Sequence, residues 1–139
     1  MVKKAPFKTV RCVIAAGDRY LLAIHNNHLP IKRTRWGLIG GRVDRGEALE
    51  SALRREVREE LYIGLDELVE VGDYRYKGSF HKVFGVETDE RIIAFDRSEL
   101  TKIGWHSLED VAALEAGGQL HTGFEFEAVQ AYHKQRRQE

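Results

Sequence analysis

Several short runs of the chain alternate between apolar and polar residues or are apolar throughout, which is the pattern of β-strands. Residues 10–16 and 19–25 lie on either side of Gly17 and Asp18, a pair that favours a tight turn, so they predict a β-hairpin. A polar loop follows at residues 26–33. Further strands are expected at residues 36–39, 69–76, 81–87, 91–95 and 102–106.

Three other segments have the composition and spacing of helices. Residues 47–61 contain neither Gly nor Pro and carry apolar side chains at a helical period. Residues 108–115 follow Ser107, a favourable N-cap, and precede Gly117, a residue type that ends helices. Residues 125–135 form the third segment. Because helices and strands are mixed along the chain, we expect an α+β fold with a mixed β-sheet between helices.

The size and charge of the chain narrow its functions. At 139 residues, with no repeat or linker, residues 1–139 are expected to form a single domain. Lys and Arg number 22, as do Asp and Glu, so no overall field favours nucleic acid or an anionic membrane as a partner. The one cysteine, Cys12, lies in an apolar run and favours a reducing compartment, and no apolar run reaches membrane-spanning length. A cytoplasmic protein is expected.

The helix predicted at residues 47–61 has carboxylates where a side chain should face the core. Its apolar stripe, widened on one side by two alanines, consists of Leu49, Leu53, Val57, Leu61, Ala48 and Ala52. At about 100° per residue, Glu56 and Glu60 fall inside this stripe and Glu59 falls at its edge. Unpaired carboxylates in such a place cost several kcal/mol each. A divalent cation would offset that cost, because hard cations such as Mg²⁺ prefer oxygen ligands.

Structural explanations exist for the same residues. The charged run R-R-E-V-R-E-E also fits a solvated helix face held by intrahelical pairs, such as Arg55 with Glu59. Asp44 can cap the helix, and Glu47 can complete a capping box. Upstream, Gly40-Gly41 predicts a turn whose backbone can approach a ligand or metal, because no Cβ stands in the way. The helix by itself therefore leaves a metal site and a solvated face both open.

The spacing of these residues resembles the Nudix box, G(x5)E(x7)REUxEExGU, in which U is aliphatic. The box is matched at Gly41, Glu47, Arg55, Glu56, Val57, Glu59, Glu60 and Ile63. The preceding W-G-L-I-G-G is similar to the family's usual lead-in. So many fixed positions make a specific motif, and the chain is identified by this resemblance as a Nudix hydrolase. The resemblance implies a Nudix-like α/β/α sandwich.

One box position departs from the family pattern. Tyr62 stands where the box has its second Gly, and Gly64 follows shortly after. Gly at that position lets a helix end in a left-handed conformation, which a bulky aromatic residue adopts poorly. We therefore expect the helix to continue to Gly64, with Tyr62 as an ordinary helical residue.

The resemblance also implies a metal centre. Glu56, Glu59 and Glu60 would hold one or more Mg²⁺ ions, helped by the Gly41 carbonyl, and Mn²⁺ is a possible substitute. The metal would bridge the oxygens of a diphosphate, neutralise charge that develops at phosphorus and lower the pKa of the attacking water.

Other roles implied by the resemblance concern catalysis and substrate. Arg55 and Glu47 would pair and so orient Glu56. Glu56 is one candidate for the general base, and Glu99, in the loop before the strand at residues 102–106, is another. For the substrate, Arg35 could meet phosphates and Phe80 could stack on a base, although a solvated basic loop and a core position are the commoner explanations.

Two classes of function remain. The first is a Mg²⁺-dependent hydrolase that cleaves a diphosphate linkage in a nucleoside diphosphate linked to another group, as in a nucleotide sugar, a nucleoside triphosphate or a dinucleoside polyphosphate. The second is a Nudix-like nucleotide-binding or regulatory module without catalysis. The intact box carboxylates favour the enzyme. The expected partner is a small nucleotide-like molecule. The sequence leaves the oligomeric state open, and a homodimer is among the arrangements that it allows.

Overall fold

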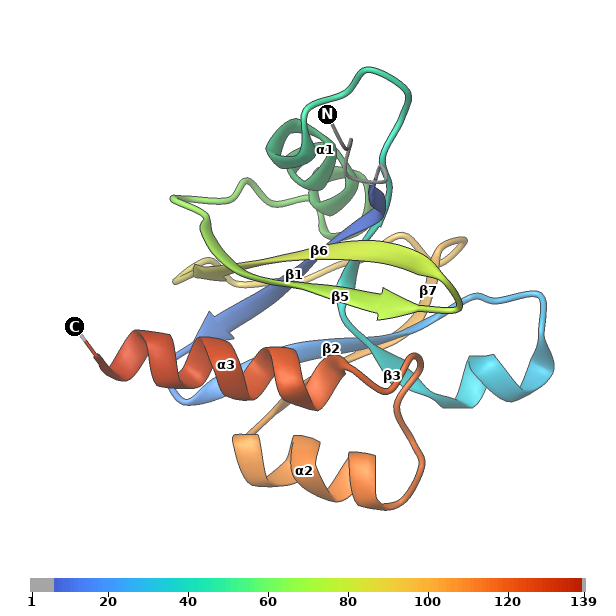
Figure 1. Ribbon diagram of the computed structural model, residues 1–139, viewed down its shortest axis with the longest axis vertical. Helices are drawn as coiled ribbons and strands as arrows, with labels where there is room; N and C mark the ends of the chain where they lie inside the picture. The colour runs from blue at the N-terminus through green and yellow to red at the C-terminus, as the bar shows by residue number, and fades with distance from the viewer. Residues whose placement is uncertain (1–6, 139) are drawn as a thin grey trace.

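The fold is a mixed β-sheet with helices on both faces, as predicted (Figure 1). The computed structural model describes residues 7–138, so residues 1–6 and 139 of the predicted domain lie outside the described residues. In chain order the elements are β1 (Phe7–Ala16), β2 (Arg19–His25), the 3₁₀ helix η1 (Pro30–Thr34), β3 (Trp36–Gly37), β4 (Ile39–Arg42), α1 (Leu49–Leu61), β5 (Val69–Tyr76), β6 (Ser79–Glu87), β7 (Leu100–His106), α2 (Leu108–Ala116) and α3 (Glu125–Arg137).

The sheet separates beside its central strand, and this separation makes room for a site. The main strand order is β3-β2-β1-β6-β5, in which β1 and β6 are parallel. β1 and β2 pair only next to their turn, at Ala15↔Tyr20 and Ala16↔Arg19. Farther along β1, strand β4 takes the neighbouring position and pairs antiparallel with it from Thr9 to Cys12. β7 pairs with β2 on the far side.

Alternation along β1 divides the core into two layers. Val10, Cys12 and Ile14 pack with the buried residues of α1 on one face of the sheet. Val13 and Ala15 face the opposite layer, where buried residues of α2 and α3 complete the core. Figure 1 shows α1 above the sheet and α2 and α3 below it. Period-two alternation of a buried central strand therefore produces the three-layer arrangement.

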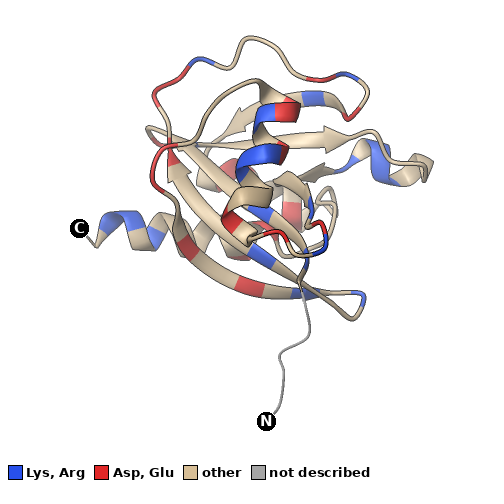
Figure 2. Ribbon diagram, turned by 90° about the horizontal axis from the view of Figure 1, so that it is seen from above, with Lys and Arg blue, Asp and Glu red and all other residues tan. Residues whose placement is uncertain are grey.

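Many predicted elements are confirmed. β5 has the predicted bounds, and Ser107 caps α2: its hydroxyl oxygen accepts the Asp110 N–H at 3.1 Å, and the Asp110 carboxylate accepts the Ser107 N–H at 3.2 Å. In the view of Figure 2, charged residues of both signs are spread over several elements and follow one another along α1. None of the helices described between residues 7 and 138 is long and apolar enough to cross a membrane.

Two strand predictions are wrong in detail. Residues 91–95 form no strand. Ile92 and Phe95 pack against the core while Ile93 is 86% exposed, so the inward positions are three apart instead of alternating. The strand expected at residues 36–39 is divided into β3, which pairs with β2, and β4, which pairs with β1. Gly40-Gly41 accordingly lies inside β4 and does not form the predicted turn.

The predicted N-terminal cap of α1 is also wrong. The helix begins at Leu49, and its N-cap, Ala48, has no side-chain cap hydrogen bond. Asp44 and Glu47 form a turn before the helix instead: the Glu47 carboxylate accepts the Asp44 N–H at 3.1 Å, and the Glu47 N–H donates to the Asp44 carbonyl at 3.0 Å. This position leaves the Glu47 side chain free to reach Arg55.

The C-terminus of α1 differs from the prediction as well. α1 ends at Leu61, and Tyr62 adopts the left-handed conformation (φ 57°, ψ 33°) that glycine normally takes there. The change of direction buries Ile63 to 7% exposure while Tyr62 stays 60% exposed. Arg54 donates to the carbonyls of Leu65 and Asp66 and fixes the segment that follows. Burial of Ile63 and these hydrogen bonds outweigh the local preference of tyrosine.

Candidate active site

A cleft of about 690 Å³ lies where β1 and β4 meet α1 and the loop before β7. Five predicted site residues line it together, namely Gly41, Glu56, Glu59, Glu60 and Glu99. A separate depression of about 310 Å³, between α3 and the segment before β5, contains none of the predicted site residues. The topology therefore brings the box carboxylates and the more distant Glu99 to one place.

The glycine pair of β4 is needed because the backbone of β1 and the carboxyl group of Glu56 approach it closely. A Cβ on Gly41 would overlap the carboxyl group of Glu56. Gly40 has φ 145°, and a Cβ there would overlap the carbonyl of Val10 on β1. The close approach at Gly40-Gly41 is thus made by β1 and by Glu56 inside a strand, and an approach of this backbone to a ligand or metal remains a prediction.

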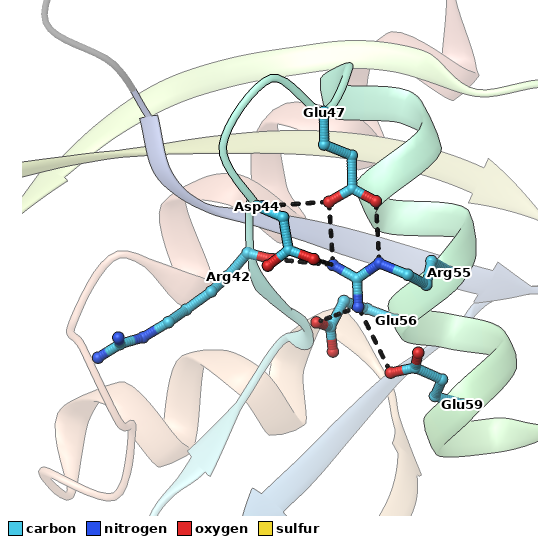
Figure 3. A network of polar contacts seen from close by, with 6 residues as sticks. All are labelled: Arg42, Asp44, Glu47, Arg55, Glu56 and Glu59. Carbon is cyan, nitrogen blue, oxygen red and sulfur yellow. Dashed lines mark hydrogen bonds and ion pairs between the residues drawn. The ribbon is translucent and has the colours of Figure 1, made fainter.

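Arg55 is the centre of a polar network on α1 (Figure 3). Its Nε and Nη2 donate to the two carboxylate oxygens of Glu47, at 2.9 and 3.0 Å. Its Nη1 donates to Glu56 at 3.0 Å and, over a longer 3.5 Å, to Glu59. The paired hydrogen bonds from Arg55 lower the pKa of Glu47, and the same bonds raise the pKa of Arg55. The predicted pairs of Arg55 with Glu47 and with Glu59 are both present.

The rest of this network fixes the guanidinium against the loop. Nη2 of Arg55 also donates to the Arg42 carbonyl at 3.3 Å and lies 3.5 Å from the Asp44 carboxylate. With contacts on three sides, the guanidinium has a defined position, and the Glu56 side chain is held by it. Fixed in this way, Glu56 presents its carboxyl group beside Gly41.

Glu60 is the least satisfied carboxylate of the cleft. It is 3% exposed, and its Oε1 has no hydrogen-bond partner among the described residues. Burial raises the pKa of Glu60 to about 8; Arg11 opposes this shift, and the negative charges of Glu56 and Glu99 add to it. Burial also raises the pKa of Glu56, against the hydrogen bond from Arg55. The inward placement of Glu60 predicted from the helical wheel is confirmed.

The residues of the cleft fit a divalent cation in donor type. Carboxylate oxygens and a backbone carbonyl are the ligands that Mg²⁺ prefers, and Glu60 offers an oxygen that no group of residues 7–138 uses. Among residues 7–138, no three His, Cys, Asp or Glu side chains converge on one point as in a completed metal cage. Glu56 and Glu59 instead lie against Arg55, at 3.0 and 3.5 Å.

Sequence reasoning missed Arg11, which lines the cleft beside the carboxylates. It lies on β1 opposite Gly40 of β4, and the negative charges of Glu60, Glu125 and Glu56 act on it. Burial outweighs these carboxylates and lowers the pKa of Arg11. An arginine between Val10 and Cys12 in an otherwise apolar run was the signal that could have identified it.

Two histidines at the same end of the cleft were missed too. Nε2 of His25 donates a hydrogen bond to the Leu38 carbonyl at 2.9 Å, and because that carbonyl only accepts, Nε2 carries the proton. Burial lowers the pKa of His25 to about 3 and that of His121 to about 4. Both imidazoles are therefore neutral at pH 7.

Two predicted substrate residues lie elsewhere. Arg35 follows η1 and does not line the cleft. Phe80, on β6, packs edge-on against Phe7 at 6.2 Å and beneath the Arg75 guanidinium at 5.2 Å, also outside the cleft. Their roles in substrate binding remain predictions.

Known proteins resemble this chain in sequence and in fold. The NUDIX domain family model matches residues 5–124. NAD-capped RNA hydrolase NudC of Citrobacter koseri is 34% identical over 112 residues, which are 77% of this chain and 42% of that protein. NudC of Escherichia coli (strain K12 / DH10B) is 33% identical over the same shares of both chains. The chain thus spans about 42% of the length of the curated relatives that it matches.

Solved structures of the same fold include two with similar coverage. DR0079 from Deinococcus radiodurans has a TM-score of 0.74 at 22% identity, over 94% of this chain and 88% of that chain. The NUDIX domain of Shewanella oneidensis NrtR, complexed with ADP ribose, has a TM-score of 0.72 at 18% identity, over 96% and 90%. A MutT NUDIX hydrolase from Burkholderia pseudomallei reaches 0.65 at 25% identity, over 77% of this chain and 87% of that one.

Proposed function

The chain belongs to the NUDIX domain family, and on that premise we propose that it is a Mg²⁺-dependent hydrolase cleaving a diphosphate linkage in a nucleoside diphosphate linked to another group. The observation that carries the proposal is Glu60, a buried carboxylate with an unpartnered oxygen beside Glu56 and Glu99. Such a group is costly to bury unless a cation pairs with it. The proposed cation is Mg²⁺, which would also neutralise the charge that develops at phosphorus when the diphosphate linkage is hydrolysed.

In this proposal the carboxylates and Gly41 bind the metal, and Arg55 positions one of the carboxylates. Glu56, Glu59, Glu60 and the Gly41 carbonyl hold the metal, which when bound would neutralise charge at phosphorus and acidify the attacking water. Arg55, fixed by both oxygens of Glu47, keeps the Glu56 carboxylate in place. Chelator should abolish turnover, and Mg²⁺ should raise the melting temperature of chelator-treated protein. Full activity in excess chelator would refute the proposal.

The general base is either Glu56 or Glu99. The raised pKa of Glu56 supports the first, and the position of Glu99 in the cleft supports the second. Replacing Glu99 with Gln distinguishes them. If Glu99 is the base, kcat falls by roughly 100-fold or more and the acidic limb of the pH profile is lost. If Glu56 is the base, the Glu99→Gln enzyme keeps that limb.

The substrate is best found with a panel that releases phosphate or a monophosphate. Nucleoside triphosphates, nucleotide sugars and dinucleoside polyphosphates test the expected class. ADP-ribose is included because the similar NrtR domain was crystallised with it, and NAD and NAD-capped RNA because the curated relatives are named for that substrate. The RNA arm also tests the expectation that nucleic acid is not a partner.

A nucleotide-binding module without catalysis is the alternative, and the NrtR domain bound to ADP ribose is the observation that favours it. Calorimetric binding of ADP-ribose without turnover of any panel member, in the presence of Mg²⁺, would support this alternative. Turnover of any member would support the hydrolase. We also propose a cytoplasmic location, supported by the buried, unpaired thiol of Cys12.

A further inference from the structure

Arg11 is a basic side chain of the cleft with few partners of its own. It projects from β1 at the point where β4 pairs with that strand, opposite Gly40. Only one hydrogen bond of its guanidinium is present within residues 7–138, from Nη1 to the Leu38 carbonyl at a long 3.5 Å. A guanidinium has five N–H donors, so most of those of Arg11 are not used by the described part of the protein.

The nearby carboxylates cannot serve as permanent partners of Arg11. Glu60 and Glu56 act on it electrostatically, but no ion pair within 4.0 Å joins Arg11 to either of them in the described part of the chain. Glu125 already accepts the backbone N–H groups of Thr122 and Gly123, at 2.9 and 2.8 Å. Arg55, in contrast, is held by Glu47 through two hydrogen bonds. The position of Arg11 is thus better explained by contact with a ligand than by contact with the described protein groups.

An anion bound in the cleft would complete this environment. When a cation neutralises Glu56 and Glu60, Arg11 keeps its own charge and loses the negative charges that compensated it. The neighbouring His25 and His121 are neutral at pH 7 and do not compete for an anion. Guanidinium groups match the paired oxygens of a phosphate.

We propose that Arg11 binds the diphosphate of the substrate, at oxygens that the metal does not use. This inference rests on the proposed function for its ligand class, a nucleoside diphosphate derivative. Arg11 and the carboxylates then contact the diphosphate from two sides of the cleft. The arrangement gives the enzyme a recognition element that does not depend on the base.

Binding of imidodiphosphate, a diphosphate analogue with a P–N–P bridge, tests the proposal at saturating Mg²⁺. Calorimetry compares wild type with Arg11→Gln, Arg11→Lys and the control Arg19→Gln, whose exposed arginine lies outside the cleft. Loss of hydrogen bonds to a charged group should weaken binding by Arg11→Gln roughly 10- to 100-fold. Arg11→Lys should be intermediate, and Arg19→Gln should bind as wild type does.

Mg²⁺ affinity without imidodiphosphate, measured at pH 9 where the carboxylates are ionised, separates substrate binding from a structural role. Arg11→Gln should bind Mg²⁺ as tightly as wild type or more tightly, because a neighbouring positive charge that repels the cation is gone. An equal loss of Mg²⁺ and imidodiphosphate affinity would overturn the proposal, since Arg11 would then organise the carboxylates. Wild-type imidodiphosphate affinity in Arg11→Gln would overturn it too.

Further outcomes are equally decisive. If Arg11→Gln does not fold, Arg11→Lys decides: weakened imidodiphosphate binding with intact Mg²⁺ affinity supports the proposal, and unchanged binding overturns it. Absence of imidodiphosphate binding by wild type at millimolar concentration also overturns it. Failure of the proposed function is a different result, because a chain that turns over no panel member can still bind imidodiphosphate through Arg11.

Discussion

Glu47 and Glu60 belong to the same sequence motif and lie at opposite ends of the α1 region, yet their environments are opposite. Both oxygens of Glu47 accept hydrogen bonds from Arg55, and its pKa is lowered. Glu60 is 3% exposed, has an oxygen without a partner in the described chain, and has a pKa raised to about 8. The protein stabilises the ionised form of Glu47, whereas burial of Glu60 disfavours its ionised form.

The two arginines of the site repeat this difference. Arg55 is surrounded by acceptors and fixes the geometry of its neighbours. Arg11 makes a single long hydrogen bond within the described residues. Charged side chains with protein partners hold the site in shape. A buried charge without a partner destabilises the fold unless a ligand binds to it, so such side chains indicate where a ligand is expected.

The largest effect is expected from Glu60→Gln. The amide keeps the shape of the side chain but removes a proposed metal ligand. Changes beside metal ligands cost about 10- to 100-fold, so loss of a ligand should lower kcat by roughly 100-fold or more. In chelator the variant should be as stable as wild type or more stable, since a buried charge is gone. A Glu60→Gln enzyme with wild-type kcat would contradict the assignment.

The second effect concerns the pH dependence of stability without metal. The pKa of Glu60 is about 8 in the folded chain, against the ordinary value of 4.5 for a glutamate side chain. Between those values the folded state binds a proton that the unfolded state has lost, so this group makes stability fall as pH rises, with no effect below the window and the full effect above it. Gln does not titrate. The other titrating groups are the same in Glu60→Gln and in wild type, so their contributions cancel when the stabilities of the two proteins are compared.

The melting temperature of Glu60→Gln minus that of wild type, in chelator, should therefore increase from about pH 5 to about pH 8 and then level off. A difference that stays flat, or that shrinks with rising pH, would show that Glu60 is not a buried carboxyl with a raised pKa.

A smaller effect on activity is expected from Glu47→Gln. The variant weakens the paired hydrogen bonds that fix Arg55 and, through it, Glu56. Glu47 acts on the proposed metal ligand Glu56 through Arg55, so its replacement should lower kcat or Mg²⁺ affinity by about tenfold. The control is Glu50→Gln, which changes an exposed residue of the first turn of α1. Equal kinetics for the two variants would remove Glu47 from the supporting network.

The smallest effect on catalysis is expected at Tyr62. Its left-handed conformation costs about 1 kcal/mol, which glycine does not incur. Tyr62→Ala is the matched control, because it removes the same ring and keeps the strained conformation. Chemical denaturation should show Tyr62→Gly more stable than Tyr62→Ala, with kcat changed less than in Glu60→Gln. The reverse order of stability would mean that the helix continues past this residue in solution.

The apolar periodicity of the chain predicted most of the elements, because the residues that a helix or strand places on one face are the same residues that become buried in the core. β5 and the capped start of α2 follow directly from alternation and from Ser107. The Nudix box placed Glu56, Glu59 and Glu60 on one helix, and a helix of regular pitch then brings them to one face. Where the pattern was ambiguous, at residues 91–95, the inward spacing changed from two to three and the strand prediction failed.

The helix end at Tyr62 shows the limit of local preference. Tyrosine disfavours the left-handed conformation, and the sequence offered Gly64 as an alternative end. Ile63 nevertheless packs into the core only if the chain turns at Tyr62. Burial of a neighbouring side chain, which sequence spacing does not reveal, decided the conformation.

The sequence by itself determined the family, the carboxylates that we propose as metal ligands and the face of α1 that carries them, because these depend on spacing along a single helix. Only the tertiary structure brought Arg11, His25 and Glu99 to that face, since they come from β1, β2 and the loop before β7. It also decided which charges are satisfied. Compensation of a charge depends on distances between elements remote in the chain, and the separation of β1 from β2 sets those distances.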